Sequence, residues 1–439
     1  FFLNVDGAQM LRRGSVRSLV PRRSARRNVV CGQKWSQKCL AIKAQEWPPF
    51  DPDNGEVLFA GSSTRELVFS WFLLSLCQRR RLVDLGTRVL GQSWICLSPG
   101  NPLSKVLLSS VKQSAFAHFC GGESLEDCVA TGKQLEAHAG VKCIVDWGVE
   151  ESSDAKFWDS NTERKVKTLH RAKEVLGSNA AFMPIKLTSL LSPALLERIT
   201  LEVNHDPNAE RGMGWQAWQD EPEAADALQR LRCLCEAAKS LAIPLLLDAE
   251  QSDRQAAVHL LARHLQAEFN VQEPIVYDTI QMYLKASPQR LEEALDSAER
   301  HGYIYAIKLV RGAYIDQERS RGSIHSCKEH TDDAFEAATK RLLQAASQRP
   351  RVALMLATHN RASLWNAVKE MDRLGLARDD PRIHFAQILG MVDNLTWALG
   401  LAGYNASKLL VFGQVHEVLP WLLRRARENR DAFGAQVLG

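Results

Sequence analysis

Short, almost continuous apolar runs alternate with amphipathic segments along the chain after residue 140. Runs without polar alternation are typical of strands that are buried on both faces, as in a parallel sheet. Between them, helical periodicity is clear at residues 287–301, 332–346 and 362–374. The pattern therefore predicts eight strands separated by helices, at residues 143–145, 184–187, 244–247, 275–277, 303–310, 352–357, 383–386 and 409–412.

Eight strands that alternate with helices over about 300 residues are typical of a (β/α)8 barrel. An open doubly wound sheet is the alternative, but no GxGxxG motif follows any of the strands. We therefore predict an α/β fold, a TIM-like (β/α)8 barrel over residues 141–439, preceded by a mostly helical region over residues 46–140. Two polar stretches, at residues 150–173 and 204–223, are predicted to be long loop insertions.

The most apolar stretch of the helical region is residues 67–77, with the sequence LVFSWFLLSLC. As a helix it would span about 16 Å, roughly half the hydrocarbon core of a bilayer. This length predicts a buried helix and excludes a membrane span. Contact with a membrane surface is the alternative.

The net charge of +4 hides an uneven distribution along the 439 residues. Residues 1–45 carry seven Arg and three Lys against a single acid, Asp6. A basic leader that is poor in acids is typical of a mitochondrial transit segment. A basic arm that binds RNA or anionic lipid is the alternative.

The ten cysteines include no CxxC pair, which favours reduced thiols over a disulfide framework. Cys233 and Cys235 have no companion ligand at zinc spacing, so no metal site is expected. The sequence also contains no GxSxG motif and no P-loop.

Polar residues stand at or just beyond the ends of most predicted strands. In a barrel these ends form the mouth where chemistry takes place, and an unpaired buried charge there costs several kcal/mol unless it meets a partner or a ligand. Any one of these residues could be an ordinary charged or polar residue at the edge of a loop. A whole series of them at the strand ends is not explained in this way. Its members are Lys186, Asp248, Glu250, Gln281, Lys308, His359, Asn360 and Gln387.

Two further segments suggest binding. Gly312 and Ala313 end a strand with almost no side chain, which lets a flat cofactor approach the backbone, and Arg311 beside them suits an anionic group. In the last predicted helix, at residues 417–432, Trp421, Arg424 and Arg425 lie at i, i+3 and i+4. This spacing suits a clamp for a small carboxylate, with a plain basic helix surface as the alternative.

Together these segments resemble the proline dehydrogenase (proline oxidase) family, from about residue 141 to residue 429. The resemblance rests on seven motifs in the family's order: IKLTSL (185–190), LLDAEQ (246–251), YDTIQMYLK (277–285), KLVRGAY (308–314), ATHN (357–360), FAQILGM (385–391) and LLRRARENR (422–430). It implies a distorted (β/α)8 barrel whose final helix lies over the mouth.

The resemblance also implies an activity: FAD-dependent oxidation of L-proline to Δ1-pyrroline-5-carboxylate, by hydride transfer to flavin N5 and with ubiquinone as electron acceptor. It implies a mitochondrial matrix enzyme in peripheral contact with the inner membrane, with no nucleic-acid partner. By the same resemblance, Lys186, Arg424 and Arg425 bind the substrate carboxylate, Asp248 orients this basic cluster, and Tyr314 lies beneath the pocket. The positions that surround FAD in the family correspond to Gln281, Lys308, Val310, Gly312, Ala313, Thr331, His359 and Gln387.

Two departures concern the substrate pocket. Leu409 and Trp421 stand where the family usually has tyrosines, so two hydroxyls are missing. The loss of a polar contact changes discrimination between substrates by roughly 1–3 kcal/mol. Hydroxyproline or another cyclic imino acid is therefore an alternative substrate, and a non-catalytic barrel whose leader binds RNA or a membrane is a third hypothesis.

Overall fold

The computed structural model describes residues 47–60, 62–77, 79–91, 101–148, 155–205, 218, 221 and 223–434. The predicted leader, residues 1–45, lies outside them. Most of the predicted insertion at residues 204–223 does as well.

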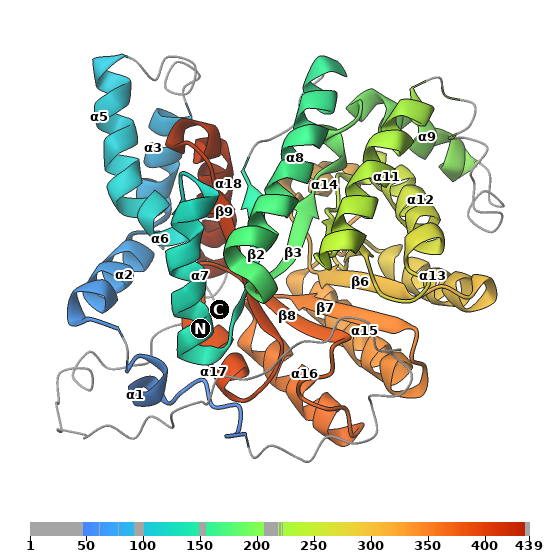
Figure 1. The fold of residues 1–439 in the computed structure, drawn as a ribbon. Helices are drawn as coiled ribbons and strands as arrows, with labels where there is room; N and C mark the ends of the chain where they lie inside the picture. Colours follow the sequence, from blue (N-terminus) through green and yellow to red (C-terminus); the bar gives the residue numbers. More distant parts are fainter. Residues whose placement is uncertain are drawn as a thin grey trace.

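Eight parallel strands form a closed barrel ringed by helices, which confirms the predicted fold class (Figure 1). The barrel closes because the last strand pairs with both the first and the preceding one. Each strand overlaps one predicted run. In barrel order they are β2 (Lys142–Trp147), β3 (Ala180–Ile185), β4 (Leu245–Leu247), β5 (Val276–Gln281), β6 (Tyr305–Val310), β7 (Val352–Ala357), β8 (Ile383–Ile388) and β9 (Ala406–Phe412).

The connecting helices cover the outside of the barrel, where their apolar faces pack on the strands. In chain order they are α8 (Ala155–Leu176), α9 (Pro193–His205), α11 (Ala224–Leu241), α12 (Ser252–Phe269), α13 (Ser287–His301), α15 (Lys328–Gln348), α16 (Arg361–Arg373) and α17 (Asp393–Leu401). Two further helices contribute no described residue to this core cluster: α14 (Ile315–Arg321), which follows β6, and α18 (Val415–Gly434), which follows the last strand. Short helical turns follow α8 and β3, at η2 (Gly177–Asn179) and η3 (Leu187–Ser189).

The predicted loop insertion at residues 150–173 is wrong, because most of that stretch is helix α8. The inward stripe of this helix contains polar residues as well as apolar ones. Asn161, Thr162 and Lys165 are buried along with Trp158 and Leu169. Since polar residues occupy several inward positions, the hydrophobic periodicity that normally identifies a helix is hidden.

The helical region before the barrel packs along one side of it. It comprises α1 (Gly55–Leu58), α2 (Thr64–Cys77), α3 (Arg80–Leu90), α5 (Pro102–Val111), η1 (Lys112–Phe116), α6 (Ala117–Phe119) and α7 (Leu125–Ala139). Between α6 and α7, residues Cys120–Gly122 form a short strand, β1, that pairs with β9 outside the closed barrel.

The prediction that residues 67–77 form a buried helix is only half right. They do form a helix within α2, and Leu73 is buried, but Val68, Trp71 and Phe72 are between 56 and 58% exposed. No helix in the described part of the chain is both long enough and apolar enough to cross a bilayer.

The barrel interior is filled below the mouth by side chains that point inward from neighbouring strands. Phe182, Tyr277 and Met355 belong to this cluster, together with Ile144 and Leu246. Successive strand residues point to opposite faces, so the residue two positions further along each strand also points inward. This alternation determines which side chains reach the mouth.

Candidate active site

Charged side chains follow the interior cluster at the C-terminal end of the barrel. Asp146 is two residues beyond Ile144, and Asp248 is two residues beyond Leu246. Because all strands are parallel, these ends meet on one side of the barrel. The polar strand-end residues predicted from sequence therefore lie at the same end of the barrel.

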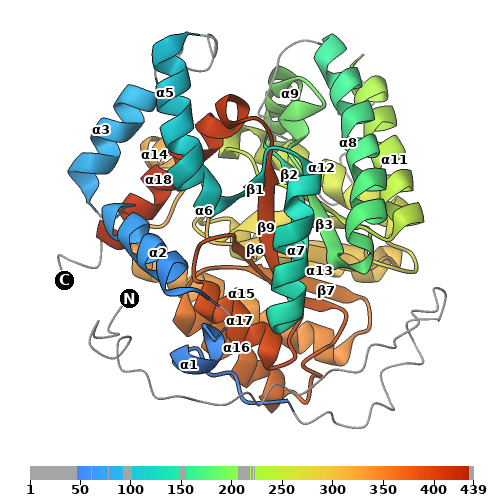
Figure 2. The same ribbon diagram turned by 60° about the vertical axis from the view of Figure 1, so that its left-hand side comes forward.

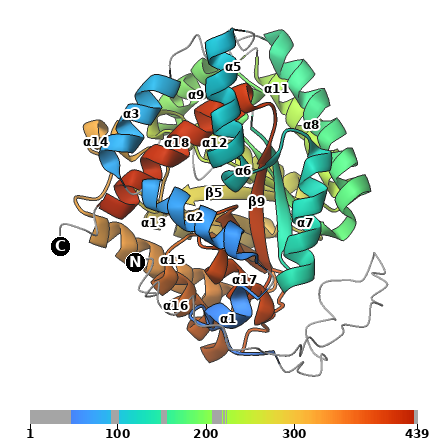
Figure 3. The ribbon, with the colours of Figure 1, turned by 90° about the vertical axis from the view of Figure 1, so that its left-hand side faces the viewer.

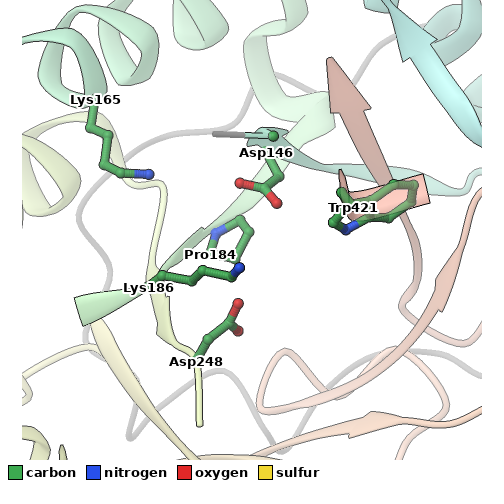
Figure 4. A pocket seen from close by; sticks show the side chains of 7 residues that line it. Asp146, Lys165, Pro184, Lys186, Asp248 and Trp421 are labelled. Carbon is green, nitrogen blue, oxygen red and sulfur yellow. The ribbon is translucent and has the colours of Figure 1, made fainter. Parts of the chain in front are cut away.

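A small cavity opens at this mouth (Figure 4). Three predicted site residues, Lys186, Asp248 and Trp421, contribute to its lining. Lys186 follows β3 directly, Asp248 follows β4, and Trp421 reaches in from α18. The remaining lining residues are Asp146, Gly148, Lys165 and Pro184.

Asp248 pairs with one lysine and shares the cavity with a second. Its carboxylate forms an ion pair of 2.5 Å with Lys308 on β6, and it lines the same cavity as Lys186. Its backbone N–H donates to the carbonyl of Ile185, which fixes the end of β4 against β3. The carboxylate of Asp248 thus binds a predicted cofactor-binding residue, Lys308, and lies in the same cavity as a predicted substrate-binding residue, Lys186.

Asp146 and Lys165 are cavity residues that sequence reasoning missed. Lys165 comes from α8 and is 5% exposed, and its side chain extends toward Asp146 (Figure 4). Burial raises the pKa of Asp146 to about 6, opposed by the charge of Lys165, while burial lowers the pKa of Lys165. Asp146 could have been found from the strand alternation, because it lies two residues after the inward-pointing Ile144. Lys165 could not be found from a sequence pattern that predicts a loop where α8 lies.

Glu250, two residues beyond Asp248, is buried. It accepts a hydrogen bond of 3.0 Å from the hydroxyl of Thr188, and burial raises its pKa to about 7. Its carbonyl accepts a 2.9 Å bond from the side-chain amide of Gln281, whose oxygen accepts from the backbone N–H of Ala313 at 3.1 Å. Gln281 therefore connects the ends of β4, β5 and β6.

His359 is a neutral imidazole at the end of β7. Its Nε2 accepts a 3.0 Å hydrogen bond from the backbone N–H of Ile388, so the ring proton is on Nδ1. Burial, reinforced by the charges of Lys408 and Arg425, lowers its pKa to about 3. His359 can therefore donate from Nδ1 over the whole physiological pH range.

Gln387 lies in the wall rather than in the cavity lining. Its amide donates to the carbonyl of Thr358, and its oxygen accepts a 2.9 Å bond from the hydroxyl of Thr396 on α17. Its neighbour two residues earlier, Phe385, packs on Tyr404 outside the interior cluster. These contacts tie Gln387 to the helix layer and leave its predicted cofactor contact as a prediction.

The turn after β6 has a conformation that requires glycine. Gly312 has φ of +145°, and a Cβ at this position would lie 1.8 Å from the ring of Tyr283. Arg311 beside it is fixed by Asp332 at 2.6 Å and stacks on the ring of Phe335. Of the other predicted residues, Val310 ends β6, Tyr314 precedes α14 and Thr331 lies in the first turns of α15.

Helix α18 brings Trp421, the aromatic residue of the predicted clamp, to the mouth. Trp421 is buried and lines the cavity, and the guanidinium of Arg425 lies 5.9 Å from the centre of its ring. The charge of Arg425 also reaches His359. Arg424, Arg425, Tyr314 and Leu409 are not among the described residues that line the cavity, although Leu409 packs against both the interior cluster and the cluster beneath α18.

The donors around the mouth suit a flavin. Neutral donors come from the Gln281 amide and from Nδ1 of His359, and Lys308 adds a positive charge. Such a set matches the uncharged polar edge of a flavin ring and its negative charge when reduced. Within the described ranges, no group of three or more His, Cys, Asp and Glu side chains is arranged to hold a metal ion.

Comparison with known protein sequences identifies the family of the chain. The family profile described as Proline dehydrogenase matches residues 128–435. The chain is 30% identical to Proline dehydrogenase 1, mitochondrial, of Arabidopsis thaliana, covering 85% of this chain and 81% of the relative. It is also 30% identical to Hydroxyproline dehydrogenase of Bos taurus, covering 90% and 94%.

Among solved structures, the chain resembles proline utilization A from Bdellovibrio bacteriovorus, crystallised after inactivation by N-propargylglycine. The TM-score is 0.66 with 16% sequence identity, over 85% of this chain. This chain corresponds to 40% of that longer protein. At this identity the likeness supports the barrel fold.

Proposed function

Because the chain belongs to the proline dehydrogenase family and is an oxidoreductase, we propose that it oxidises L-proline to Δ1-pyrroline-5-carboxylate. The observation that carries the proposal is the cavity at the barrel mouth. There, Lys186 and Asp248 face Trp421 of α18. A small cyclic imino acid presents one carboxylate and one apolar ring, and this lining offers a cation and an aromatic face.

The reaction removes a hydride from the ring carbon next to nitrogen and a proton from the nitrogen, which leaves a C=N double bond. FAD, when bound, supplies the hydride acceptor at its N5 atom and allows the electrons to pass on to ubiquinone. The residues proposed to hold it are Gln281, Lys308, Val310, Gly312, Ala313, Thr331, His359 and Gln387.

The protein's own groups bind and orient the substrate. Lys186, Arg424 and Arg425 bind the carboxylate, since charged hydrogen bonds to it are stronger than neutral ones. Asp248 keeps Lys186 and Lys308 in place, and Tyr314 supports the pocket from below. The indole of Trp421 covers the ring and excludes water from the reacting carbon.

The proposed location is the mitochondrion, on the matrix side and in contact with the inner membrane. Relatives from Arabidopsis thaliana and Homo sapiens are named mitochondrial. The basic segment at residues 1–45 is proposed as the transit segment, residues 46–140 as a helical region, and residues 141–439 as the FAD-binding barrel.

Hydroxyproline is a second candidate substrate, supported by two observations. Leu409 and Trp421 lack the hydroxyls usual in the proline-oxidising family, and several relatives at about this identity are named hydroxyproline dehydrogenases. An altered ring-binding surface changes which ring substituent the pocket accepts.

An anaerobic absorbance titration tests both candidates. We expect the purified protein to carry flavin bands that bleach on addition of L-proline. Bleaching by trans-4-hydroxyproline with no response to proline would favour the second candidate. A protein without flavin bands, even after incubation with FAD, or one whose bands respond to neither imino acid, would contradict the proposed activity.

A further inference from the structure

A second cavity lies among the helices that surround the barrel, between α8 and the beginnings of α9 and α11. Figures 2 and 3 show α8 and α11 side by side on the outside of the barrel. The volume of this cavity is about 120 Å³, enough for several water molecules or one small organic molecule. We call it the outer cavity. It shares no lining residue with the cavity at the barrel mouth.

The floor of the outer cavity is apolar. Trp158 of α8 lines it together with Leu191, just before α9, and Leu195 in the first turn of that helix. All three side chains are buried. An aromatic ring and two aliphatic side chains beneath an open space suit the hydrocarbon part of a small ligand.

Charges of both signs surround this floor, and they come from the beginning of α11. Glu223 precedes the helix, and Asp226 lies in its first turn; both side chains are exposed. Arg230, four residues after Asp226, is mostly buried, and its guanidinium lies 5.6 Å from the ring centre of Trp158. The cavity therefore offers two anions and one cation around an apolar surface.

The guanidinium of Arg230 has donors left for a ligand. Its Nε donates to Asp159 at 2.6 Å, and its Nη1 donates to the carbonyl of Leu190 at 3.3 Å. A guanidinium has five N–H groups, and these two bonds account for two of them among the described residues. The N–H groups of Nη2 can therefore bind an acceptor in the cavity.

We propose that the outer cavity binds a free amino acid with a small apolar side chain. The ammonium group of the ligand meets Glu223 and Asp226, and its carboxylate accepts hydrogen bonds from Arg230. Its side chain packs on Trp158 and Leu191. Hydrogen bonds between charged groups are stronger than those between neutral ones, so both ends of the ligand contribute to affinity.

Ligands with a single charge fit the outer cavity less well. A simple anion such as phosphate would be attracted by Arg230 but repelled by Glu223 and Asp226. A simple amine would pair with the two carboxylates and gain nothing from the guanidinium. A zwitterion satisfies charges of both signs at once.

A short segment connects the outer cavity to the barrel mouth. Lys186 lines the mouth cavity and is followed by η3 and then by Leu191 of the outer cavity. The hydroxyl of Ser189 donates to the carbonyl of Lys186 at 2.7 Å, and Arg230 donates to the carbonyl of Leu190. The guanidinium that binds the ligand therefore also holds the segment that follows Lys186.

Helix α8 provides a second connection. Trp158 lines the outer cavity, and Lys165, seven residues later, lines the mouth cavity. Seven residues are about two helical turns, so both side chains lie on the same side of α8. Between them, the amide of Asn161 donates to the carbonyl of Ser189 at 2.7 Å. Both connections thus meet in the segment between β3 and α9.

A ligand in the outer cavity should therefore weaken binding of the imino acid at the mouth. Its carboxylate competes with the carbonyl of Leu190 for Arg230, because that bond is longer than the bond to Asp159. Loss of this bond loosens the segment behind Lys186, so the KM for the imino acid rises. This kinetic consequence rests on the proposed function, whereas binding of the ligand rests on the outer cavity alone.

Isothermal titration calorimetry of the full-length holoprotein with L-valine tests the site. We expect one L-valine bound per chain. Isobutylamine, which lacks the carboxylate, and 3-methylbutanoate, which lacks the amine, should each bind at least tenfold more weakly. Asp226→Asn and Glu223→Gln should each weaken binding of L-valine about tenfold, as expected for loss of one charged hydrogen bond. Glu236→Gln, at an exposed position on the same helix, is the matched control and should bind like the wild type.

Two further variants separate the outer cavity from the mouth. Arg230→Gln should abolish binding of L-valine, and circular dichroism shows whether it is folded. The two acid variants change exposed side chains, so they test the site even if Arg230→Gln does not fold. Lys186→Met changes the mouth cavity only and should still bind L-valine.

Steady-state kinetics test the connection between the two cavities. Increasing L-valine should raise the KM for L-proline about fivefold and then have no further effect, because a coupling between two sites is finite. Simple competition at the mouth would let the KM rise without limit. In Asp226→Asn, the same concentrations of L-valine should have much less effect on the KM.

Four results would overturn the proposal. The first is the absence of binding heat with L-valine in the wild type. The second is isobutylamine that binds as tightly as L-valine. The third is binding that Lys186→Met removes and Asp226→Asn retains, which would place L-valine at the mouth. The fourth is a KM that L-valine raises without limit or does not change. A protein that oxidises neither imino acid would contradict the proposed function, and calorimetry would still decide whether the outer cavity binds L-valine.

Discussion

Asp146 provides a pH-dependent contribution to stability at the scale of a single residue. Its pKa in the folded protein, about 6, lies above the usual value for an aspartate because of burial. The protonated carboxyl group therefore contributes fully to the stability of the fold below the pKa that this aspartate has in the unfolded chain. That contribution is lost as the pH rises through about 6. Asp146→Asn cannot ionise, so its Tm relative to the wild type should rise between about pH 4 and about pH 7 and stay constant above that.

Above the folded pKa, the free energy of unfolding of Asp146→Asn should exceed that of the wild type by about 1–3 kcal/mol. This value corresponds to a pKa raised by roughly two, and it is reduced because Asp146 is only partly buried. Thermal unfolding of both proteins across the pH range measures it. Asp296→Asn, at an exposed position on α13, is the control and should follow the wild type. Parallel pH curves for the wild type and Asp146→Asn would show that the carboxyl is not held in its neutral form.

The carboxylate clamp is tested by single substitutions of its arginines. Arg425→Gln and Arg424→Gln should each raise the KM for the imino acid by a factor of ten or more, because a charged hydrogen bond contributes roughly 1.5–3 kcal/mol. Steady-state kinetics measure the effect, and an unchanged flavin spectrum shows that the fold is intact. Arg373→Gln, on the exposed side of α16, is the control. Wild-type KM values in both clamp variants would disprove the assignment.

At the scale of an element, the turn from β6 to α14 depends on Gly312. An alanine there would combine an unfavourable positive φ with a Cβ 1.8 Å from the ring of Tyr283. Gly312→Ala should therefore cost about 2–4 kcal/mol of stability and release flavin. Gly322→Ala, at the end of α14, has φ of +68° but open space around its Cβ, so it should cost only about 1–2 kcal/mol.

Urea unfolding and the flavin content of the purified variants measure this pair. Because φ at Gly322 is in the left-handed region that alanine tolerates better, the difference between the variants measures the backbone strain at position 312 together with the contact with Tyr283. Equal destabilisation would mean that neither makes glycine at 312 more necessary than at 322.

The elements differ in how well the sequence predicted them. The eight strands were found because both faces of each strand are buried, which leaves a continuous apolar run. Helix α8 was missed because Asn161, Thr162 and Lys165 replace apolar residues on its inward stripe. The apolar run of α2 predicts burial, but Val68, Trp71 and Phe72 are exposed. Sequence alone does not show which apolar residues of a helix the rest of the protein covers.

The candidate site was also predicted only in part from the sequence. Lys186, Asp248 and Trp421 were predicted, and the structure brings them into one cavity. Asp146 and Lys165 complete that cavity, but neither belongs to a motif that sequence reasoning identified. A packed side chain such as Lys165 takes its role from the residues opposite it, and these are known only once the barrel is closed.

At the scale of the whole molecule, closure of the barrel depends on β9 and on its fully buried Lys408. Strand β9 pairs with β8 on one side and with β2 on the other. The ammonium of Lys408 forms an ion pair with Asp393 at 2.6 Å and donates to the carbonyls of Ile388 and Met391. It thereby holds a turn in which Val392 has φ of +47°, a conformation that is costly for a β-branched residue.

The same turn joins the barrel to the helical region, since His118 of α6 contacts the carbonyl of Gly390 at 2.9 Å. Lys408→Met should therefore lower the free energy of unfolding by about 3–5 kcal/mol, because it leaves Asp393 and two carbonyls without their buried cation. Lys167→Met, at an exposed position on α8, should change it by less than about 1 kcal/mol. Denaturant unfolding compares the two variants. If Lys408→Met were as stable as the control, hydrogen bonding between the strands alone would be sufficient to close the barrel, and Lys408 would not be needed to hold the turn.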